Sequence, residues 1–245
     1  MSPTKKSRSP VTVQKIQERL QTLGDPQKAQ ILQRFFKTGP GEYGQGDVFV
    51  GLRVPDIRKL AKEYSSLPLP ATLRLLRSPI HEARLLALLI LVQAARCADS
   101  ALQKQICDLY LQNTRFINNW DLVDLSAYHI VGPQLKSGSG HRPAGLAASR
   151  LIWDRRIAIM ATFHLIKKGE FSLTLTTARR LLKDPEDLIH KAVGWMLREV
   201  GKRDQKTEES FLKDHYRIMP RTMLRYAIER FPEGLRQRYL KGEIA

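Results

Sequence analysis

Apolar residues recur three and four positions apart along most of this chain, and strictly alternating stretches are rare. A spacing of three and four matches one face of an α-helix, whereas alternation is typical of a half-buried β-strand. The longest apolar run, Leu85 to Ala95, lies between Arg84 and Arg96. It is too short to cross a bilayer, so it predicts a buried helix. The pattern as a whole predicts an all-α protein.

Several helix boundaries carry recognisable start and stop signals. Gly24 is expected to end one helix in a left-handed conformation, after which Asp25 caps the next helix and Pro26 begins it. Asp184 and Pro185 repeat that arrangement later in the chain. Such signals divide the chain into about a dozen helices.

The helices also suggest an internal repeat. Helices centred on five ionisable residues recur about every 32 to 40 residues, and each follows a shorter helix and a turn. This period is typical of HEAT-like repeats, in which antiparallel helix pairs stack into a curved solenoid whose second helices line the inner face. The repeat is degenerate, and an irregular helical bundle fits it as well. The five central residues are Arg84, Asp124, Arg156, Lys191 and Arg225.

Two segments interrupt the helical rhythm without dividing the chain into domains. The segment 39–47 holds four glycines and a proline, which predicts a loop or tight hairpin. The segment 137–145 predicts a flexible insertion within the helical array. We therefore expect a single repeat domain over residues 11–245, preceded by a flexible basic tail at residues 1–10.

Charge narrows the class of partner. The chain has 41 Lys and Arg against 24 Asp and Glu, a net charge of +17, while 42% of its residues are hydrophobic. Such an excess of positive charge causes repulsion within the folded protein, so we expect a polyanionic partner. Nucleic acid is a more favoured partner than a membrane. The alternative is that the charge serves solubility alone. The two cysteines and six histidines show no metal-ligand spacing, which predicts no metal. No apolar signal core follows the basic start, so we expect a cytoplasmic protein, associated with the nucleoid if bacterial.

Trp120 and Asp124 are four residues apart, so one helix face carries both an indole and a carboxylate. Together these groups can stabilise a developing cation, the carboxylate by Coulomb attraction and the indole by its negative ring face. Spacing alone favours a simpler interpretation, a core tryptophan beside a surface aspartate. Arg155 and Arg156 cannot project in the same direction, so we expect one to reach a phosphate and the other to contact solvent or an acid.

Trp195 lies on a predicted helix face rich in positive charge, which is typical of nucleic-acid binding but also of a solvated basic face around one buried ring. The cations on that face are Lys191, Arg198 and Lys202. A second basic cluster near the C-terminus is a further possible phosphate surface, for which a solvated helix is the favoured interpretation. Its members are Arg221, Arg225 and Arg230.

Three stretches of the chain resemble the AlkD-type DNA alkylation repair proteins. They are 119–124, 153–159 and 191–199, and the likeness extends from about Gln27 to Arg230. The order and separation of the stretches make the match more specific than any single motif. The resemblance implies a HEAT-like fold and excision of cationic N3- and N7-alkylpurines from duplex DNA, with neither a metal nor an organic cofactor.

The resemblance also assigns roles to residues of this chain. Trp120, Asp124 and Trp195 would form the catalytic cleft, and Arg156 would contact a phosphate beside it. The sugar cation left by the departing base would be stabilised by the carboxylate and the two rings. No lysine is placed as a Schiff-base nucleophile, so the expected enzyme is a monofunctional glycosylase. We expect a monomer, because DNA would occupy the concave face.

This chain departs from the family pattern at two places in its first quarter. Phe35 stands where a tyrosine with a hydroxyl contact to DNA is expected, and the 39–47 loop, which carries Tyr43, looks like an insertion. Both residues remain expected DNA contacts. Some relatives with such changes bind DNA, including branched DNA, without excising a base. A non-catalytic protein that binds damaged or branched DNA is therefore the alternative function, and a protein scaffold is a less favoured third.

Overall fold

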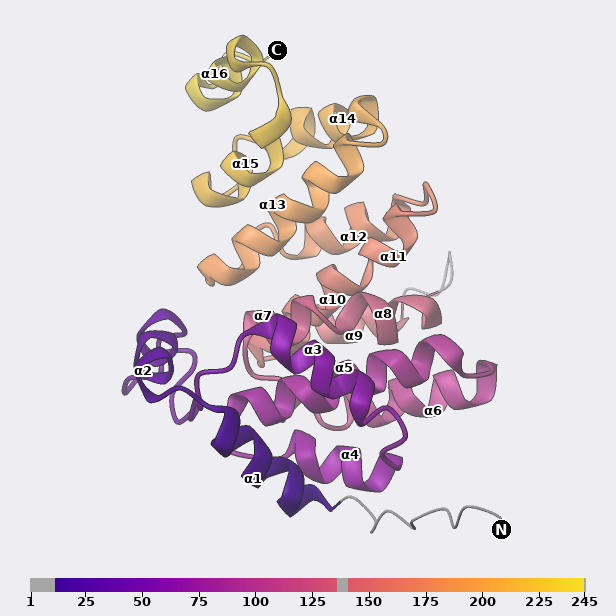
Figure 1. The fold of residues 1–245 in the computed structure, drawn as a ribbon. Helices are drawn as coiled ribbons and strands as arrows, with labels where there is room; N and C mark the ends of the chain where they lie inside the picture. The colour runs from indigo at the N-terminus through magenta and orange to yellow at the C-terminus, as the bar shows by residue number, and fades with distance from the viewer. Residues whose placement is uncertain (1–11, 136–140, 245) are drawn as a thin grey trace, which may run out of the picture. The chain divides into compact units, whose positions relative to one another are not determined.

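The structure is a computed structural model that describes residues 12–135 and 141–244, and most of these residues are helical (Figure 1). Within these two ranges, the β-type pairing is limited to an isolated bridge between Val48 and Ile80. The prediction of an all-α protein is confirmed. The expected tail, residues 1–10, lies outside the described residues. Across the described part of the chain, no helix combines the length and the apolar character that a membrane span requires.

The chain divides into two compact units, Met1–Ala94 and Ala95–Ala245. The continuous repeat domain expected over residues 11–245 stays a prediction. The helices of the first unit are α1 (Val13–Leu23), α2 (Pro26–Phe35), α3 (Val54–Glu63), α4 (Leu69–Leu76) and α5 (His81–Cys97), whose last turn belongs to the second unit. Those of the second unit are α6 (Ser100–Leu111), η1 (Thr114–Phe116), α7 (Trp120–Asp124), α8 (Ala127–Ile130), η2 (Gly132–Gln134), α9 (His141–Ala147), α10 (Ile152–Ala161), α11 (Phe163–Ile166), α12 (Ser172–Arg180), α13 (Asp187–Gly201), α14 (Gln205–His215), α15 (Arg221–Ala227), η3 (Ile228–Arg230) and α16 (Glu233–Lys241).

The boundary between α1 and α2 follows its sequence signals, with one difference. Asp25 caps α2 by accepting the backbone N–H groups of Gln27 and Lys28, each at 3.1 Å, and Pro26 is the first helical residue. Gly24 is not left-handed, since its φ is −65°. A Cβ on Gly24 would lie 2.5 Å from the carbonyl oxygen of Val50. The glycine therefore permits close approach of two backbones instead of a left-handed turn.

The segment 39–47 is a loop of successive turns, as predicted, and its end is fixed by a buried polar cluster. Asp47 lies 2.6 Å from Nη2 of Arg84 and 3.1 Å from Nδ1 of His81, and all three side chains are buried. The ring of His81 also stacks on Phe49, with centroids 4.4 Å apart. A buried charge is tolerated only when it is paired, so this cluster holds the loop to the start of α5.

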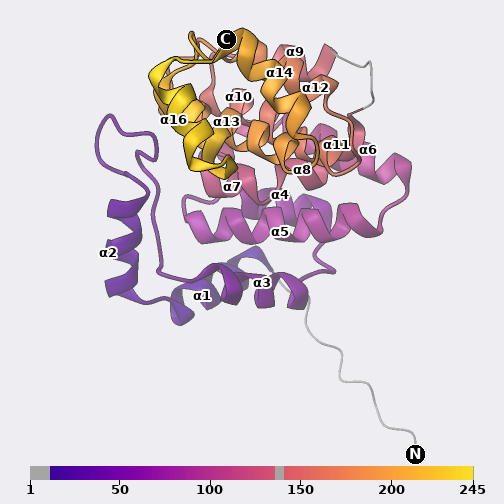
Figure 2. The ribbon, with the colours of Figure 1, turned by 90° about the horizontal axis from the view of Figure 1, so that it is seen from above.

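Helix α2 stands apart from α3 and α4 of its own unit in both views (Figure 1, Figure 2). Ala29 is the one residue of α2 that is buried. Ile31 and Phe35, one turn apart, are 65% and 61% exposed. Phe35 is therefore a surface residue, as a DNA contact must be, although the contact itself stays a prediction.

Four helices of the second unit pack successively, α7 against α10, α10 against α13 and α13 against α15 (Figure 1). The insertion expected at 137–145 is only partly described, and from His141 onward it is helical and not a loop. This helix, α9, packs against α10 and buries Ala147. Its few apolar positions make no periodic pattern, so only the contact with α10 reveals it.

A hydrogen-bond pattern at the entry to three helices supports the degenerate repeat. The side chains of Ser78, Ser149 and Asp184 each accept the backbone N–H two positions later, at 3.0–3.2 Å. The side chain six positions later then donates back to the carbonyl of that same residue, at 2.5–3.0 Å. The three donors are Arg84, Arg155 and His190. Asp184 thus caps the turn before α13, which begins at Asp187, two residues later than the Asp184–Pro185 signal indicates.

Candidate functional site

A buried arginine joins three helices of the second unit. Arg156 on α10 is 4% exposed, and its Nε and Nη2 lie 2.9 and 2.7 Å from the two carboxylate oxygens of Asp124 on α7. Its Nη1 donates to the carbonyl of Leu188 on α13. Two parallel charge-assisted hydrogen bonds fix both distance and orientation. The carboxylate of Asp124 is therefore held in one direction by a residue that is itself held by the next helix.

Two opposing effects act on Asp124, whose side chain is 12% exposed. Burial raises the pKa of Asp124 above its usual range, and the negative charge of Asp121 adds to that shift. The Arg156 guanidinium opposes the rise in pKa by favouring the ionised form. The bidentate pair thus offsets part of the cost of burying a carboxylate at this depth.

The short helix α7 presents Trp120 and Asp124 on one side. The side-chain oxygen of Asn119 accepts the N–H of Trp120 at 2.8 Å and so begins the helix. Leu122, on the opposite side of the helix, and Val123 are fully buried and anchor it, whereas Trp120 and Asp124 are only partly buried. One helix turn therefore brings an indole and a carboxylate to the same partly open surface.

The third predicted catalytic residue, Trp195, lies on α13 and is partly buried. Its indole Nε1 is 3.3 Å from Oε1 of Glu199, one turn later. The same carboxylate accepts Lys202 at 2.6 Å and Arg203 at 3.2 Å. Burial raises the pKa of Glu199, but these hydrogen bonds and charges outweigh it and leave the pKa below its usual value. An ionised Glu199 thus orients the ring of Trp195.

Arg156 connects the two parts of this arrangement. It binds Asp124 directly and also binds Leu188, which lies seven residues before Trp195 on α13. Seven residues are close to two helical turns, so Leu188 and Trp195 lie on the same side of α13. Asp124 and Arg156 are therefore in direct contact, Trp120 lies one turn before Asp124 on α7, and Trp195 lies about two turns beyond Leu188 on α13.

The two neighbouring arginines both bind acids. Arg155 contacts Asp184, with Nε 2.6 Å from Oδ2, and is mostly buried. Arg156 contacts Asp124, so its fork is not directed at solvent as a phosphate contact would require. We expected one arginine to reach a phosphate and the other to contact solvent or an acid, and this expectation is wrong for the phosphate contact. Each arginine instead neutralises a carboxylate from a different neighbouring segment.

The cations expected to contact DNA around Trp195 are in ion pairs. Lys191 lies 2.8 Å from Asp187, Lys202 binds Glu199, and Arg198 binds Glu229. Their side chains range from 16% to 40% exposed. The other two expected contacts, Phe35 and Tyr43, belong to the first unit, where Phe35 is exposed and Tyr43 is partly buried.

The sequence did not predict that two acidic residues of this region bind Trp195 and Arg155. Glu199 is four residues after Trp195, a spacing that places both on one helix face and that could have identified it. Asp184 was recognised only as a helix cap, because its partner Arg155 is 29 residues away and nothing local links them.

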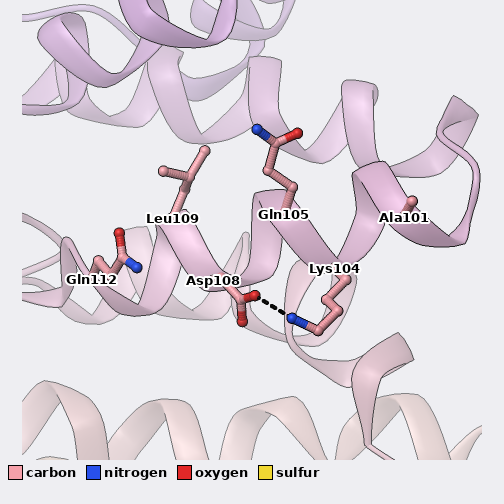
Figure 3. Close-up of a pocket in the computed structure, with 6 residues that line it drawn as sticks. All are labelled: Ala101, Lys104, Gln105, Asp108, Leu109 and Gln112. Atoms are coloured by element: carbon pink, nitrogen blue, oxygen red, sulfur yellow. Dashed lines mark hydrogen bonds and ion pairs between the residues drawn. The ribbon is translucent and has the colours of Figure 1, made fainter.

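A shallow cavity of about 290 Å³ lies elsewhere on the second unit, along α6 (Figure 3). It is bordered by polar and apolar residues of α6 and its C-cap, and Lys104 and Asp108 form an ion pair there, 2.8 Å apart. None of the residues expected to be catalytic borders it. The group around Asp124 therefore remains the stronger candidate site.

Comparisons with known proteins agree on a family. A family model described as DNA alkylation repair enzyme matches residues 16–231. A solved structure described as a predicted DNA alkylation repair enzyme from Enterococcus faecalis superposes with a TM-score of 0.66 and 19% identity, covering 86% of this chain and 97% of that one. At that identity the likeness concerns the fold. No curated protein matches the chain.

Proposed function

Since this chain belongs to the family of DNA alkylation repair enzymes, we propose that it is a DNA glycosylase for cationic N3- or N7-alkylated purines in duplex DNA. The observation that carries the proposal is the carboxylate of Asp124, which is held by Nε and Nη2 of Arg156 and lies one turn from Trp120. A net charge of +17 supports a polyanionic substrate.

Such a reaction needs little assistance at the base. Alkylation at N3 or N7 already makes the purine positively charged, so no general acid is needed for it to leave. When the bond between C1′ and the purine nitrogen breaks, its electron pair stays with the base, which departs neutral. The sugar is left with oxocarbenium-like charge until water adds to C1′ and loses a proton. Because water and not a lysine is the nucleophile, the DNA strand stays intact.

The proposed catalytic groups act on the sugar cation. Asp124 stabilises it by Coulomb attraction, which is strong in a partly buried site where water screens poorly. Trp120 and Trp195 add the negative faces of their rings. These contributions strengthen as positive charge develops on the sugar, so they lower the transition state more than the ground state.

Arg156 acts in this proposal as a positioning residue and not as a phosphate contact. It favours the ionised form of Asp124 against the burial that raises the pKa of that carboxyl. It also fixes the direction of the carboxylate through two hydrogen bonds. Of the cations expected to contact DNA, Lys191 is better placed than Arg156 to meet a phosphate, because both members of its ion pair with Asp187 are exposed and such pairs are weak and exchange their partners readily.

One observation favours a second function, binding of damaged or branched DNA without excision. Both oxygens of Asp124 are already hydrogen-bonded to Arg156, which neutralises part of the charge that a sugar cation would need. The exposed Phe35 and the 39–47 loop would then serve to grip an unusual DNA shape.

The decisive experiment measures release of free 7-methylguanine from a duplex that holds one such lesion, under excess protein and in the presence of a chelator. We expect release by the wild type and a loss of about 100-fold in single-turnover rate for Asp124→Asn, with DNA affinity nearly unchanged. Asp108→Asn, which removes an exposed carboxylate of α6, is the matched control. Equal losses of rate and affinity in Asp124→Asn would contradict the proposed role, and tight binding by the wild type with no release would favour the second function.

A further inference from the structure

A cavity of about 300 Å³ opens near the C-terminal end of the second unit, between the turn that precedes α15 and the last turn of α16. Two buried rings, Tyr216 and Tyr239, line it and pack edge to face with centroids 5.4 Å apart. Three cationic side chains also line it, and among its described lining residues none is acidic. The cations are Arg217, Arg221 and Lys241.

The two arginines of the cavity are positioned by uncharged oxygens. Arg221 donates from Nη2 to the backbone carbonyl of Leu240 at 2.9 Å. Arg217 donates from Nε to the hydroxyl of Tyr216 at 3.0 Å, and that hydroxyl is held by the carbonyl of Ile244 at 2.9 Å. These contacts orient the guanidinium groups, and neither arginine forms an ion pair with another described residue.

This arrangement differs from that of three largely buried arginines of the protein. Arg84, Arg155 and Arg156 each meet a carboxylate, at 2.6–2.7 Å in their closest contact. In those pairs the charge is already neutralised inside the protein. At the C-terminal cavity, by contrast, three cations of exposed residues line one opening, and a bound anion would relieve their mutual repulsion.

We propose that this cavity binds a phosphate group. Oriented guanidinium forks suit the paired oxygens of a phosphate, and a lysine adds a mobile third donor. The volume lies at the lower end of that of ligand sites, which suits a small anionic group and not a large apolar ligand. The phosphate is either a phosphodiester of bound DNA or a free phosphate, since the chemistry that recognises them is the same.

The first arm of the test uses inorganic phosphate and the full chain. Phosphate is titrated while NMR follows the Nε–Hε resonances of Arg217 and Arg221, and we expect both to shift with saturation. In Lys241→Gln the affinity for phosphate obtained from this titration should fall several-fold. The side chain of Lys241 makes no hydrogen bond or ion pair to another described residue, so this variant removes charge without removing a structural contact. Arg238→Gln, an exposed cation of α16 outside the cavity, is the matched control and should bind phosphate as the wild type does.

The second arm measures the affinity for undamaged duplex DNA as salt is raised. If the cavity takes a DNA phosphodiester, Arg217→Gln combined with Lys241→Gln lowers the slope of log affinity against log salt by about one, while Arg238→Gln has a smaller effect. If phosphate binds but this slope equals that of the control, the site takes free phosphate. Absence of saturable phosphate shifts together with an unchanged slope would overturn the proposal. Neither arm requires base excision, so the result is independent of the proposed glycosylase activity.

Discussion

The indole N–H of Trp195 points to the carboxylate of Glu199, with Nε1 3.3 Å from Oε1. Glu199 is itself held by Lys202 and Arg203, so the ring is oriented by an acid that cannot easily turn away. A ring that is to stabilise a cation must present its face and not its edge. The orientation of Trp195 therefore depends on a residue that does not take part in the chemistry.

Removal of this acceptor should impair excision more than binding. We expect Glu199→Ala to lower the single-turnover rate of 7-methylguanine release by about ten- to a hundredfold, because the indole loses its fixed direction. Glu199→Gln keeps an oxygen acceptor for the indole and should recover most of the rate. Equal rates for the two variants would show that the hydrogen bond to Trp195 is irrelevant to excision.

The pair of Asp124 and Arg156 should also be visible in stability. Arg156→Ala leaves a buried carboxylate without its partner, so the free energy of unfolding should fall by about 3–5 kcal/mol in denaturant titrations. In an Asp124→Asn background, Arg156→Ala should lower the free energy of unfolding much less, because no buried charge is then left without a partner. Arg180→Ala, which removes an exposed arginine of α12, should stay within about 0.5 kcal/mol of the wild type. Additive losses in the double variant would mean that the two side chains are not energetically coupled.

A buried acid at the start of α14 predicts a pH dependence of stability. Glu208 is 1% exposed, and burial, with a smaller contribution from the charge of Glu209, raises its pKa to about 8 from a model-peptide value of 4.5. Between these two pKa values the unfolded chain has released this proton and the folded chain has kept it. The contribution of Glu208 therefore destabilises the fold progressively as pH rises from about 4.5 to about 8.

Replacement by a neutral isostere should remove that dependence. Glu208→Gln should gain stability relative to the wild type at pH 9, by roughly 2–4 kcal/mol, and should gain little at pH 4, where the acid is protonated in both states. Denaturant titrations at the two pH values measure the difference, with Glu18→Gln on the exposed side of α1 as the control. An equal effect of Glu208→Gln at both pH values would rule out the raised pKa as its cause.

The contact between α13 and α15 depends on a glycine. A Cβ on Gly194 would lie 2.4 Å from the carbonyl oxygen of Met223 and 2.5 Å from Cβ of Tyr226. Gly194→Ala should therefore lower the melting temperature, although alanine is the better helix former by about 1 kcal/mol. Gly234→Ala in α16 meets no atom within 4 Å and should be neutral or stabilising. A stabilised Gly194→Ala variant would show that the two helices separate at little cost.

Local patterns were sufficient for the helical class and for most of the residues of the candidate site. Apolar spacing predicted the buried run within α5, and the Asp25–Pro26 signal marked the start of α2, because both depend on contacts within a few residues. The pairing of Trp120 with Asp124 on one face also follows from spacing within a single turn. The resemblance to a family added Trp195, which no local rule connects to Asp124.

What the sequence left open depends on groups that are distant along the chain. Arg156 was expected to reach a phosphate, yet it is directed to Asp124 and Leu188, each 32 residues away. Gly24 was expected to turn left-handed, yet its role is set by the backbone at Val50. The sequence determined which residues are charged, apolar or helical, since those are properties of each residue and its near neighbours. Only the packed structure decided which charges meet, because a buried charge must find its partner among side chains that the folding of several helices brings together.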